Sequence, residues 1–281
     1  MEKAVKSLNI KGHLHFTDKP LVMGILNVTP DSFYPPSRKQ SDAAIHRRIE
    51  EILDEGGTIV DVGGYSSRPA AADVSEAEEM QRLLPALSCL KTHYPDVAVS
   101  VDTFRAEVAR RAVEEYGAAI VNDISGGEMD GRMFETVAAL HVPYILMHMR
   151  GTPATMQQQP DYADMMEEIM LYFAEKLRTL QLLGAGDIIL DPGFGFGKTL
   201  DRNYELMRAL PGFAVFERPL LVGVSRKSMI YKLLNNTPDE CLNGTTVLNT
   251  FALLHGADIL RVHDVKAAVE AIEIVYKLKN G

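Results

Sequence analysis

The chain repeats one pattern: a short, continuous run of aliphatic residues, then a polar residue and a loop, and then a helical periodicity. Because the runs are continuous rather than alternating, they are typical of strands that are covered on both faces, as in parallel sheets. Eight such runs occur, at residues 21–26, 58–60, 97–101, 118–121, 142–147, 187–190, 219–224 and 257–260. Eight strand–helix units suit the roughly 250 residues of a (β/α)8 barrel, whereas a doubly wound open sheet usually has about five or six strands. We therefore predict an α/β fold, a single TIM-barrel domain over residues 1–281.

Helical periodicity is clearest between these runs, at residues 43–55, 76–90, 105–116, 161–183 and 265–278. Asp42 and Ser75 are the residue types expected as N-caps of the first two helices, and Gly117 is the residue type expected to end the third. The residues before the first strand are not needed for the eight strand–helix units of the barrel. We expect them to form a short N-terminal extension with a β-hairpin across residues 10–16.

Composition narrows the function classes. The net charge is −9, from 29 Lys and Arg against 38 Asp and Glu, which argues against nucleic-acid or anionic-membrane partners. No stretch reaches the roughly 18 apolar residues of a membrane span, and the N-terminal segment lacks the apolar run of a signal peptide. Cys89 and Cys241 lie far apart with no CxxC spacing, so neither a disulfide framework nor a zinc ribbon is expected. We expect a cytoplasmic protein.

Every aliphatic run ends in polar residues. These are Asn27, Asp61, Asp102, Asn122 with Asp123, His148, Asp191, the Ser225-Arg226-Lys227 triplet, and Arg261 with His263. In a (β/α)8 barrel the carboxyl ends of the strands meet at the active site. Carboxylates and amides come from the middle strands and cations from the last two, so the matching ligand has paired N–H donors at one end and an anion at the other.

At these same positions the chain resembles the dihydropteroate synthase family of pterin-binding (β/α)8 barrels. The matching segments, in family order, are 23–33 (MGILNVTPDSF), 61–64 (DVGG), 66–69 (SSRP), 100–103 (SVDT), 121–124 (VNDI), 147–149 (MHM), 190–198 (LDPGFGFGK), 225–228 (SRKS) and 261–265 (RVHDV). The resemblance implies an enzyme of folate synthesis and a target of sulfonamides. It condenses 4-aminobenzoate with (7,8-dihydropterin-6-yl)methyl diphosphate, and releases dihydropteroate and diphosphate.

The resemblance also implies a role for each site residue. The pterin ring would be held by Asp102, Asn122, Met147, Asp191, Lys227 and Arg261, with Met147 as the apolar floor of the pocket. The diphosphate would meet Asn27, Arg261 and His263, and Asn27 would contact Mg²⁺, a hard ion that favours oxygen ligands. The 4-aminobenzoate pocket would use Phe33, Ser67, Arg68, Phe196 and Ser228. Catalysis would rest on Asn27, Lys227, Arg261 and His263, and the family is commonly a homodimer.

Three departures from the family pattern lie on the aminobenzoate side: Ser67 where Thr is usual, Tyr65 where an acidic or small residue is expected, and Pro35-Pro36 in a loop where Gly is common. Two prolines should stiffen that loop. Some positions have a plainer interpretation: Asp61 as a brace for its loop, His148 as a hydrogen-bonded histidine at the rim of the site, and Lys198 as a solvated lysine.

Two other functions compete with the synthase. A methyltransferase that moves a methyl group from methyltetrahydrofolate to a corrinoid shares the barrel and the pterin carboxylates. It does not need the segments at 66–69 and 225–228, which are both present. A non-catalytic pterin-binding paralogue would be expected to lose Asn27, Arg68, Lys227 or Arg261, and all four remain. For the strand-end groups as a set, the plain alternative is a structural ion-pair network at the barrel mouth.

Overall fold

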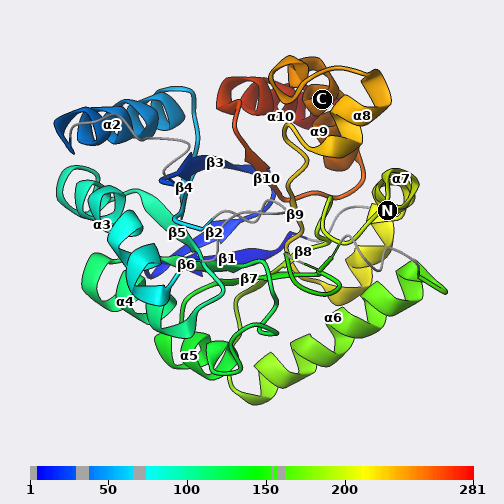
Figure 1. Cartoon of the computed structure of the whole chain (residues 1–281). Coiled ribbons are helices and arrows are strands. Elements are labelled where there is room, and N and C mark those ends of the chain that lie inside the picture. The colour runs from blue at the N-terminus through cyan, green and yellow to red at the C-terminus, as the bar shows by residue number, and fades with distance from the viewer. Residues whose placement is uncertain (1–4, 30–37, 66–73, 154, 157–161) are drawn as a thin grey trace.

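Eight parallel strands form the centre of the molecule. The computed structural model describes residues 5–29, 38–65, 74–153, 155–156 and 162–281. The strands are β3 (Leu21–Asn27), β4 (Ile59–Gly63), β5 (Ala98–Asp102), β6 (Ile120–Asp123), β7 (Tyr144–Met147), β8 (Ile188–Asp191), β9 (Leu221–Val222) and β10 (Ile259–Val262). They pair in the order β8-β7-β6-β5-β4-β3-β10-β9, and a parallel bridge between Leu190 and Leu220 joins the two ends of the sheet. The ring of strands lies inside a ring of helices (Figure 1), which confirms the predicted TIM barrel.

The N-terminal extension is the predicted hairpin. Strands β1 (Ser7–Ile10) and β2 (His13–Phe16) pair antiparallel, with Ile10 opposite His13. The two turn residues, Lys11 and Gly12, both have positive φ, which is the backbone of a tight two-residue hairpin turn. Leu8 and Ile10 are buried against the first inward-facing residues of the barrel strands, so the hairpin seals the amino-terminal end of the barrel.

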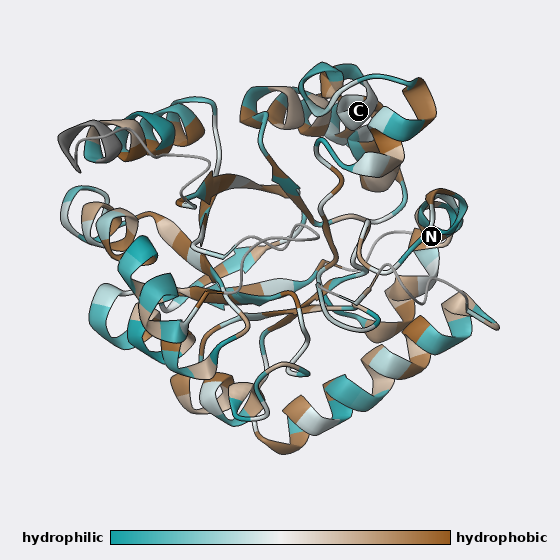
Figure 2. Ribbon diagram, viewed as in Figure 1, coloured by the Kyte–Doolittle hydropathy of each residue, from teal (hydrophilic) through white to brown (hydrophobic). Residues whose placement is uncertain are grey.

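A layer of apolar side chains fills the barrel above the hairpin. It consists of Met23, Ile59, Ala119, Ile120, Ile145, Ile189, Leu221 and Ile259, together with Leu8 and Ile10 of the hairpin. A second and larger core lies between the strands and the surrounding helices. In Figure 2 the strands are largely brown, whereas the helices carry both colours, as expected when the strands are buried on both faces, by the barrel interior and by the surrounding helices.

The helices that surround the strands are α2 (Arg38–Asp54), α3 (Glu76–His93), α4 (Ala106–Tyr116), α5 (Met133–Leu140), α6 (Met165–Leu182), α7 (Leu200–Arg208), α8 (Ser228–Leu234), α9 (Leu242–Leu254) and α10 (Val265–Asn280), with 3-10 turns η1 (Leu210–Phe216) and η2 (Pro238–Glu240). Ser75 caps α3 as predicted, because its side chain accepts a hydrogen bond from the Glu78 amide. Gly117 ends α4 with φ 74°. Asp42 as an N-cap was wrong, since α2 begins earlier, at Arg38. Residues 38–41 are entirely polar, and apolar periodicity cannot detect such a turn.

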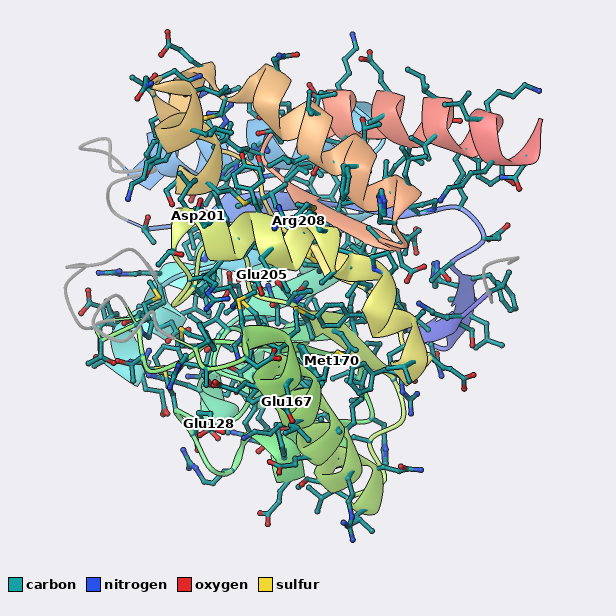
Figure 3. The ribbon with its side chains drawn as sticks, turned by 90° about the vertical axis from the view of Figure 1, so that its right-hand side faces the viewer. Glu128, Glu167, Met170, Asp201, Glu205 and Arg208 are labelled. Carbon is teal, nitrogen blue, oxygen red and sulfur yellow. The ribbon has the colours of Figure 1, made fainter. Side chains whose placement is uncertain are left out.

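The outer faces of α6 and α7 carry charged side chains. In Figure 3, α7 faces the viewer with Asp201 and Arg208 exposed, and α6 lies below it with exposed Glu167. Over the part of the chain that the structure describes, no helix combines the length and the apolar character that a membrane crossing requires.

Candidate active site

The alternation of side chains along each strand determines which residues of the site point into the barrel. Side chains two apart on a strand face the same way, so the residue two positions beyond an inward-facing strand residue also points into the barrel. Counted from that layer, the inward positions are Asp61, Asn122, Met147, Asp191 and Arg261, and the same spacing leads from Ile25 to Asn27 and from Ser100 to Asp102. The interior therefore changes from aliphatic to polar within one pleat, at the carboxyl ends of the strands.

Arg261 joins the strand ends into an ion-pair network. Its Nε donates to Asp61 Oδ2 at 2.6 Å, and its Nη2 donates to Asp102 Oδ2 at 2.6 Å. Asn122 Nδ2 also donates to Asp61 Oδ2, at 3.2 Å. Asp102, Asn122 and Arg261, three of the five residues of the ion-pair network that the sequence offered as a structural alternative, are thus joined through Asp61, and Arg261 is fixed between two carboxylates.

Asp61 has a different role from the loop brace considered for it. Its carboxylate is fully buried and pairs with Arg261 and Asn122. The sequence did contain a signal for this role, because Asp61 follows Ile59 at the spacing that also places Arg261 after Ile259. What the sequence could not supply is the pairing itself, which joins residues 200 positions apart.

Burial sets the charges of the network. It raises the pKa of Asp102 to about 7, and the nearby Asp61 adds to the increase while Arg261 opposes it. Burial alone would lower the pKa of Arg261, but Asp61 and Asp102 together raise it, so the guanidinium stays charged. Burial lowers the pKa of Lys227 to about 8 against the attraction of Asp191. The site therefore holds a carboxyl group and an ammonium group that both titrate near neutrality.

Asp191 and Lys227 line the other side of the site. Asp191 Oδ1 accepts the amide of Gly193 at 2.8 Å, and burial raises the pKa of this carboxyl group. Lys227 Nζ donates to the carbonyl of Phe194 at 2.6 Å and lies 4.8 Å from the centre of the Phe196 ring. The Lys227 ammonium and the Phe196 ring therefore lie side by side, and a flat polar heterocycle can use both a charged donor and an aromatic surface.

An apolar cluster lies beside these polar groups. Met147, Phe104, Ile124, Met149 and Met156 form it, with Phe196, Tyr65 and Met129 packed against it. The ring of Tyr65, one of the departures from the family pattern, meets Phe104 edge-on with 5.1 Å between ring centres. Met147 therefore belongs to an apolar cluster next to the polar groups at the strand ends.

Asn27 and His263 lie at the same end of the barrel. Asn27 Oδ1 and Asp102 Cβ lie on either side of Gly63, because a Cβ built on this residue would be 3.4 Å from the first and 3.5 Å from the second. His263 Nδ1 is 3.1 Å from Ser225 Oγ. Burial, followed by the charge of Arg261, lowers the pKa of His263 to about 4, so the ring is neutral near pH 7.

The predicted aminobenzoate residues are only partly visible. Ser228 is the first residue of α8, directly after Lys227, and Phe196 lies beside the Lys227 ammonium. Phe33, Ser67, Arg68 and Pro35-Pro36 lie outside the described residues.

The positions of Lys198 and His148 in the structure differ from those that we expected from the sequence. Lys198 is 5% exposed, so the solvated lysine was wrong. Its Nζ lies 3.1 Å from His148 Nδ1 and donates to the Gly193 carbonyl at 2.9 Å. His148 is also 5% exposed and belongs to the packed interior rather than the rim. The loop after β8 folds back over β7, which no local sequence pattern reveals.

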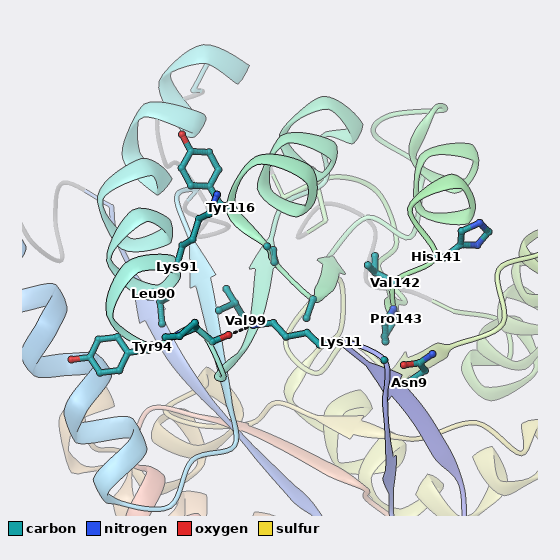
Figure 4. Close-up of a pocket in the computed structure, with 15 residues that line it drawn as sticks. Asn9, Lys11, Leu90, Lys91, Tyr94, Val99, Tyr116, His141, Val142 and Pro143 are labelled. Atoms are coloured by element: carbon teal, nitrogen blue, oxygen red, sulfur yellow. Dashed lines mark hydrogen bonds between the residues drawn. The ribbon is translucent and has the colours of Figure 1, made fainter.

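A separate cavity of about 390 Å³ lies at the opposite, amino-terminal end of the barrel (Figure 4). It is lined by the hairpin turn, the ends of α3 and α4, and the starts of β5 to β7. Its lysines already have partners: Lys11 donates to the carbonyls of Pro95 and Val97, and Lys91 to that of Glu115. It contains none of the predicted site residues.

Comparison with known proteins identifies the family of the chain. Residues 23–263 match the pterin binding enzyme family, and the chain belongs to that family. It is 46% identical over 260 residues to dihydropteroate synthase of Escherichia coli (strain K12), covering 91% of this chain and 90% of that protein. The crystal structure of Yersinia pestis dihydropteroate synthase with a sulfonamide drug complex matches with TM-score 0.90 and 40% identity, covering 98% of this chain and all of the other. That of the Thermus thermophilus synthase in complex with 4-aminobenzoate matches with TM-score 0.86 and 35% identity, over 97% of this chain and all of the other.

The comparisons support a transferase of folate biosynthesis, with the activity of a dihydropteroate synthase. They favour it over the corrinoid methyltransferase and the non-catalytic paralogue.

Proposed function

We propose that the strand ends of this barrel bind a pterin diphosphate and 4-aminobenzoate and join them. The bond that forms lies between the arylamine nitrogen and the pterin methylene carbon. The bond that breaks is the carbon–oxygen bond to diphosphate, which leaves with the electron pair, and the amine loses one proton. The observation that carries this proposal is the inward polar ring at the strand ends, with carboxylates and Asn122 on the middle strands and Lys227 and Arg261 from the last two.

Asp102, Asn122 and Asp191 are proposed to bind the polar edge of the pterin. Ionised carboxylates accept paired N–H groups strongly, and this suits the 2-amino group and adjacent ring nitrogen. Lys227 donates to a ring acceptor from the opposite side, and Met147 packs against the ring face. The short contacts around Arg261 and Lys227 hold these groups in place before any ligand binds.

Arg261, Asn27 and His263 are proposed to face the diphosphate. Arg261 has five N–H donors, and the two carboxylates occupy two of them, so others can reach the departing oxygens. Neutral His263 would act through hydrogen bonding rather than charge, and Ser225 orients it. These groups stabilise the negative charge that develops as the bond breaks.

Mg²⁺ is proposed as the metal, with Asn27 as its protein contact. The described residues contain no convergence of three His, Cys, Asp or Glu side chains of the kind that holds a metal by protein ligands alone. A single amide oxygen suits Mg²⁺, which keeps several waters and is commonly bound through substrate phosphates. When bound, the ion would neutralise charge on the diphosphate.

A matched pair of lysine variants tests the proposal. We expect Lys227→Met to abolish diphosphate release from the two substrates, because the ammonium that meets the ring is lost. Lys232→Met changes an exposed lysine on α8, the helix that begins directly after Lys227, and should keep full activity. Unchanged turnover of Lys227→Met, with a thermal transition like that of the control, would contradict the assignment of Lys227.

The aminobenzoate side and the assembly are also proposals. Phe33, Ser67, Arg68, Phe196 and Ser228 are proposed to contact 4-aminobenzoate. A homodimer is supported by exposed apolar side chains on the adjacent helices α9 and α10, namely Val247, Leu254, Ile274 and Leu278. Light scattering of the wild type and of an Ile274→Glu variant tests the dimer, which the charge should weaken. We propose a cytoplasmic location on the sequence argument above.

A further inference from the structure

The loop between β8 and α7 is built around a buried cation. Lys198 Nζ donates to the Gly193 carbonyl at 2.9 Å and to the Phe196 carbonyl at 3.1 Å, and lies 3.1 Å from His148 Nδ1. The His148 carbonyl is a further 3.5 Å contact. No carboxylate forms an ion pair with Lys198 among the described residues; Asp191 and Lys227 act on it only at longer range.

The contacts of Lys198 provide one hydrogen-bond acceptor for each N–H group of its ammonium. An ammonium group has three N–H donors, and the Gly193 carbonyl, the Phe196 carbonyl and His148 Nδ1 are three acceptors. Nδ1 accepts only when the imidazole is neutral with its proton on Nε2. Burial, with the charge of Lys198 beside it, lowers the pKa of His148, which keeps the ring in that neutral form. Burial also lowers the pKa of Lys198 to about 7, so the ammonium depends on these acceptors.

The loop that Lys198 binds contacts both Asp191 and Lys227 of the candidate site. The amide of Gly193 donates to Asp191, the carbonyl of Phe194 accepts from Lys227, and the Phe196 ring lies beside the Lys227 ammonium. The two loop carbonyls that Lys198 binds belong to Gly193 and Phe196, on either side of Phe194. Lys198 therefore sets the spacing of the segment that holds Asp191 and Lys227.

Glycine lets the loop lie this close to its neighbours. Gly193 has φ 72°, and a Cβ there would lie 1.9 Å from the His148 carbonyl oxygen. A Cβ on Gly195, at φ 82°, would lie 3.3 Å from the Lys227 side chain. With no side chains at these positions, the path of the loop depends on its polar contacts.

We propose that Lys198 is a positioning residue for pterin recognition: its ammonium clamps the 193–196 loop against His148 and so fixes the groups that orient Asp191 and Lys227. Lys198 does not touch substrate in this assignment. The inference rests on the proposed pterin contacts of Asp191 and Lys227, and adds the device that holds them.

A double-mutant cycle tests the clamp. Lys198→Met keeps the length of the side chain and removes the charge. We expect it to weaken binding of the pterin diphosphate, titrated without 4-aminobenzoate, by about tenfold or more, and to raise KM for that substrate more than it lowers kcat. In a Lys227→Met background the same change should have a several-fold smaller effect, because residues that act through one another are not additive. Lys232→Met serves as the control in both backgrounds.

A second pair of variants covers the case in which Lys198→Met does not fold. His148→Asn keeps an acceptor oxygen near the Nδ1 position, and His148→Phe removes it. We expect His148→Asn to bind the pterin diphosphate within about threefold of the wild type, and His148→Phe to lose affinity as Lys198→Met does.

The outcomes separate the clamp from the proposed function. If Lys227→Met itself leaves pterin affinity unchanged, the assignment of Lys227 fails. If Lys227→Met weakens binding but Lys198→Met does not, or does so equally in both backgrounds, the clamp is overturned. Equal affinities of His148→Asn and His148→Phe would also overturn it.

Discussion

Pterin binding should depend on pH directly through two groups that are proposed to contact the ring, while Lys198, whose pKa burial lowers to about 7, adds to the fall on the alkaline side through its loop. Asp102, with a pKa of about 7, must be ionised to accept N–H groups from the ring, and Lys227, with a pKa of about 8, must be protonated to donate. Activity should therefore rise as pH increases through about 7 and fall as it increases beyond about 8. The pKa values read from such a profile are apparent values that belong to the interacting groups together. The acid limb is assigned to Asp102 and the alkaline limb to Lys227, because the carboxylate binds when ionised and the ammonium when protonated.

The size of the effect follows from these two pKa values. At pH 6 roughly a tenth of Asp102 is ionised, and at pH 9 roughly a tenth of Lys227 is protonated. Because the two limbs lie about one unit apart, the maximum falls between pH 7 and 8 and includes just over half of the molecules in the active form. We expect kcat/KM for the pterin diphosphate to fall about sixfold at pH 6, and at least sixfold at pH 9, where the loss of charge on Lys198 adds to that on Lys227.

Diphosphate release measured across this range tests the reasoning, with Asp61→Asn as the diagnostic variant. The charge of Asp61 contributes to the raised pKa of Asp102, so removing it should move the acid limb to lower pH. A limb that arises from ionisation of the substrate would stay in place in this variant. A wild-type profile that is flat between pH 6 and 8, or an acid limb that Asp61→Asn leaves unmoved, would refute the assignment to Asp102.

Three further outcomes are expected. Asp61→Ala leaves the Arg261 guanidinium with one of its two carboxylate partners, and should lower the free energy of unfolding by about 3–5 kcal/mol in urea titrations; a loss below about 1 kcal/mol would contradict the network. Gly193→Ala should abolish pterin binding in a calorimetric titration, since its Cβ would lie 1.9 Å from the His148 carbonyl oxygen, and normal affinity would mean the loop is not tightly packed. EDTA should suppress diphosphate release and Mg²⁺ should restore it, as Asn27 near a diphosphate implies; full activity in EDTA would remove the metal assignment.

The barrel could be predicted from the sequence because each of its strands is marked by a few consecutive residues. Each strand is a continuous aliphatic run, and both the pleat and the polar end of a strand are contained in a few consecutive residues. Position 261 shows this well: it follows Ile259 by two residues and so faces the barrel interior at its carboxyl end. Short-range chemistry also identified the Ser75 cap of α3 and the Gly117 end of α4.

What the sequence did not reveal depends on contacts between distant segments. The partners of Arg261 are Asp61 on β4 and Asp102 on β5, which are remote in sequence, and they come within reach only because β10 pairs with β3 in the sheet. Lys198 looked like a surface lysine because its acceptors are backbone carbonyls and a histidine 50 residues away. Every residue has a backbone carbonyl, so the sequence does not show which carbonyls will bind a lysine. The burial of Lys198 therefore could not be predicted from the pattern of side chains.

The two cations of the site are held in different ways, and this difference matches two different tasks. Arg261 is held by two carboxylates on β4 and β5, so its position is set before substrate binds and does not depend on a loop. A group fixed in advance needs no reorganisation as charge develops on a leaving group, which is the condition for electrostatic catalysis. Lys227 is held by one loop carbonyl and one ring face, and that loop depends in turn on Lys198. Recognition of the ring is therefore the part of the reaction that a change in the loop should disturb first, while stabilisation of the leaving group stays with the barrel.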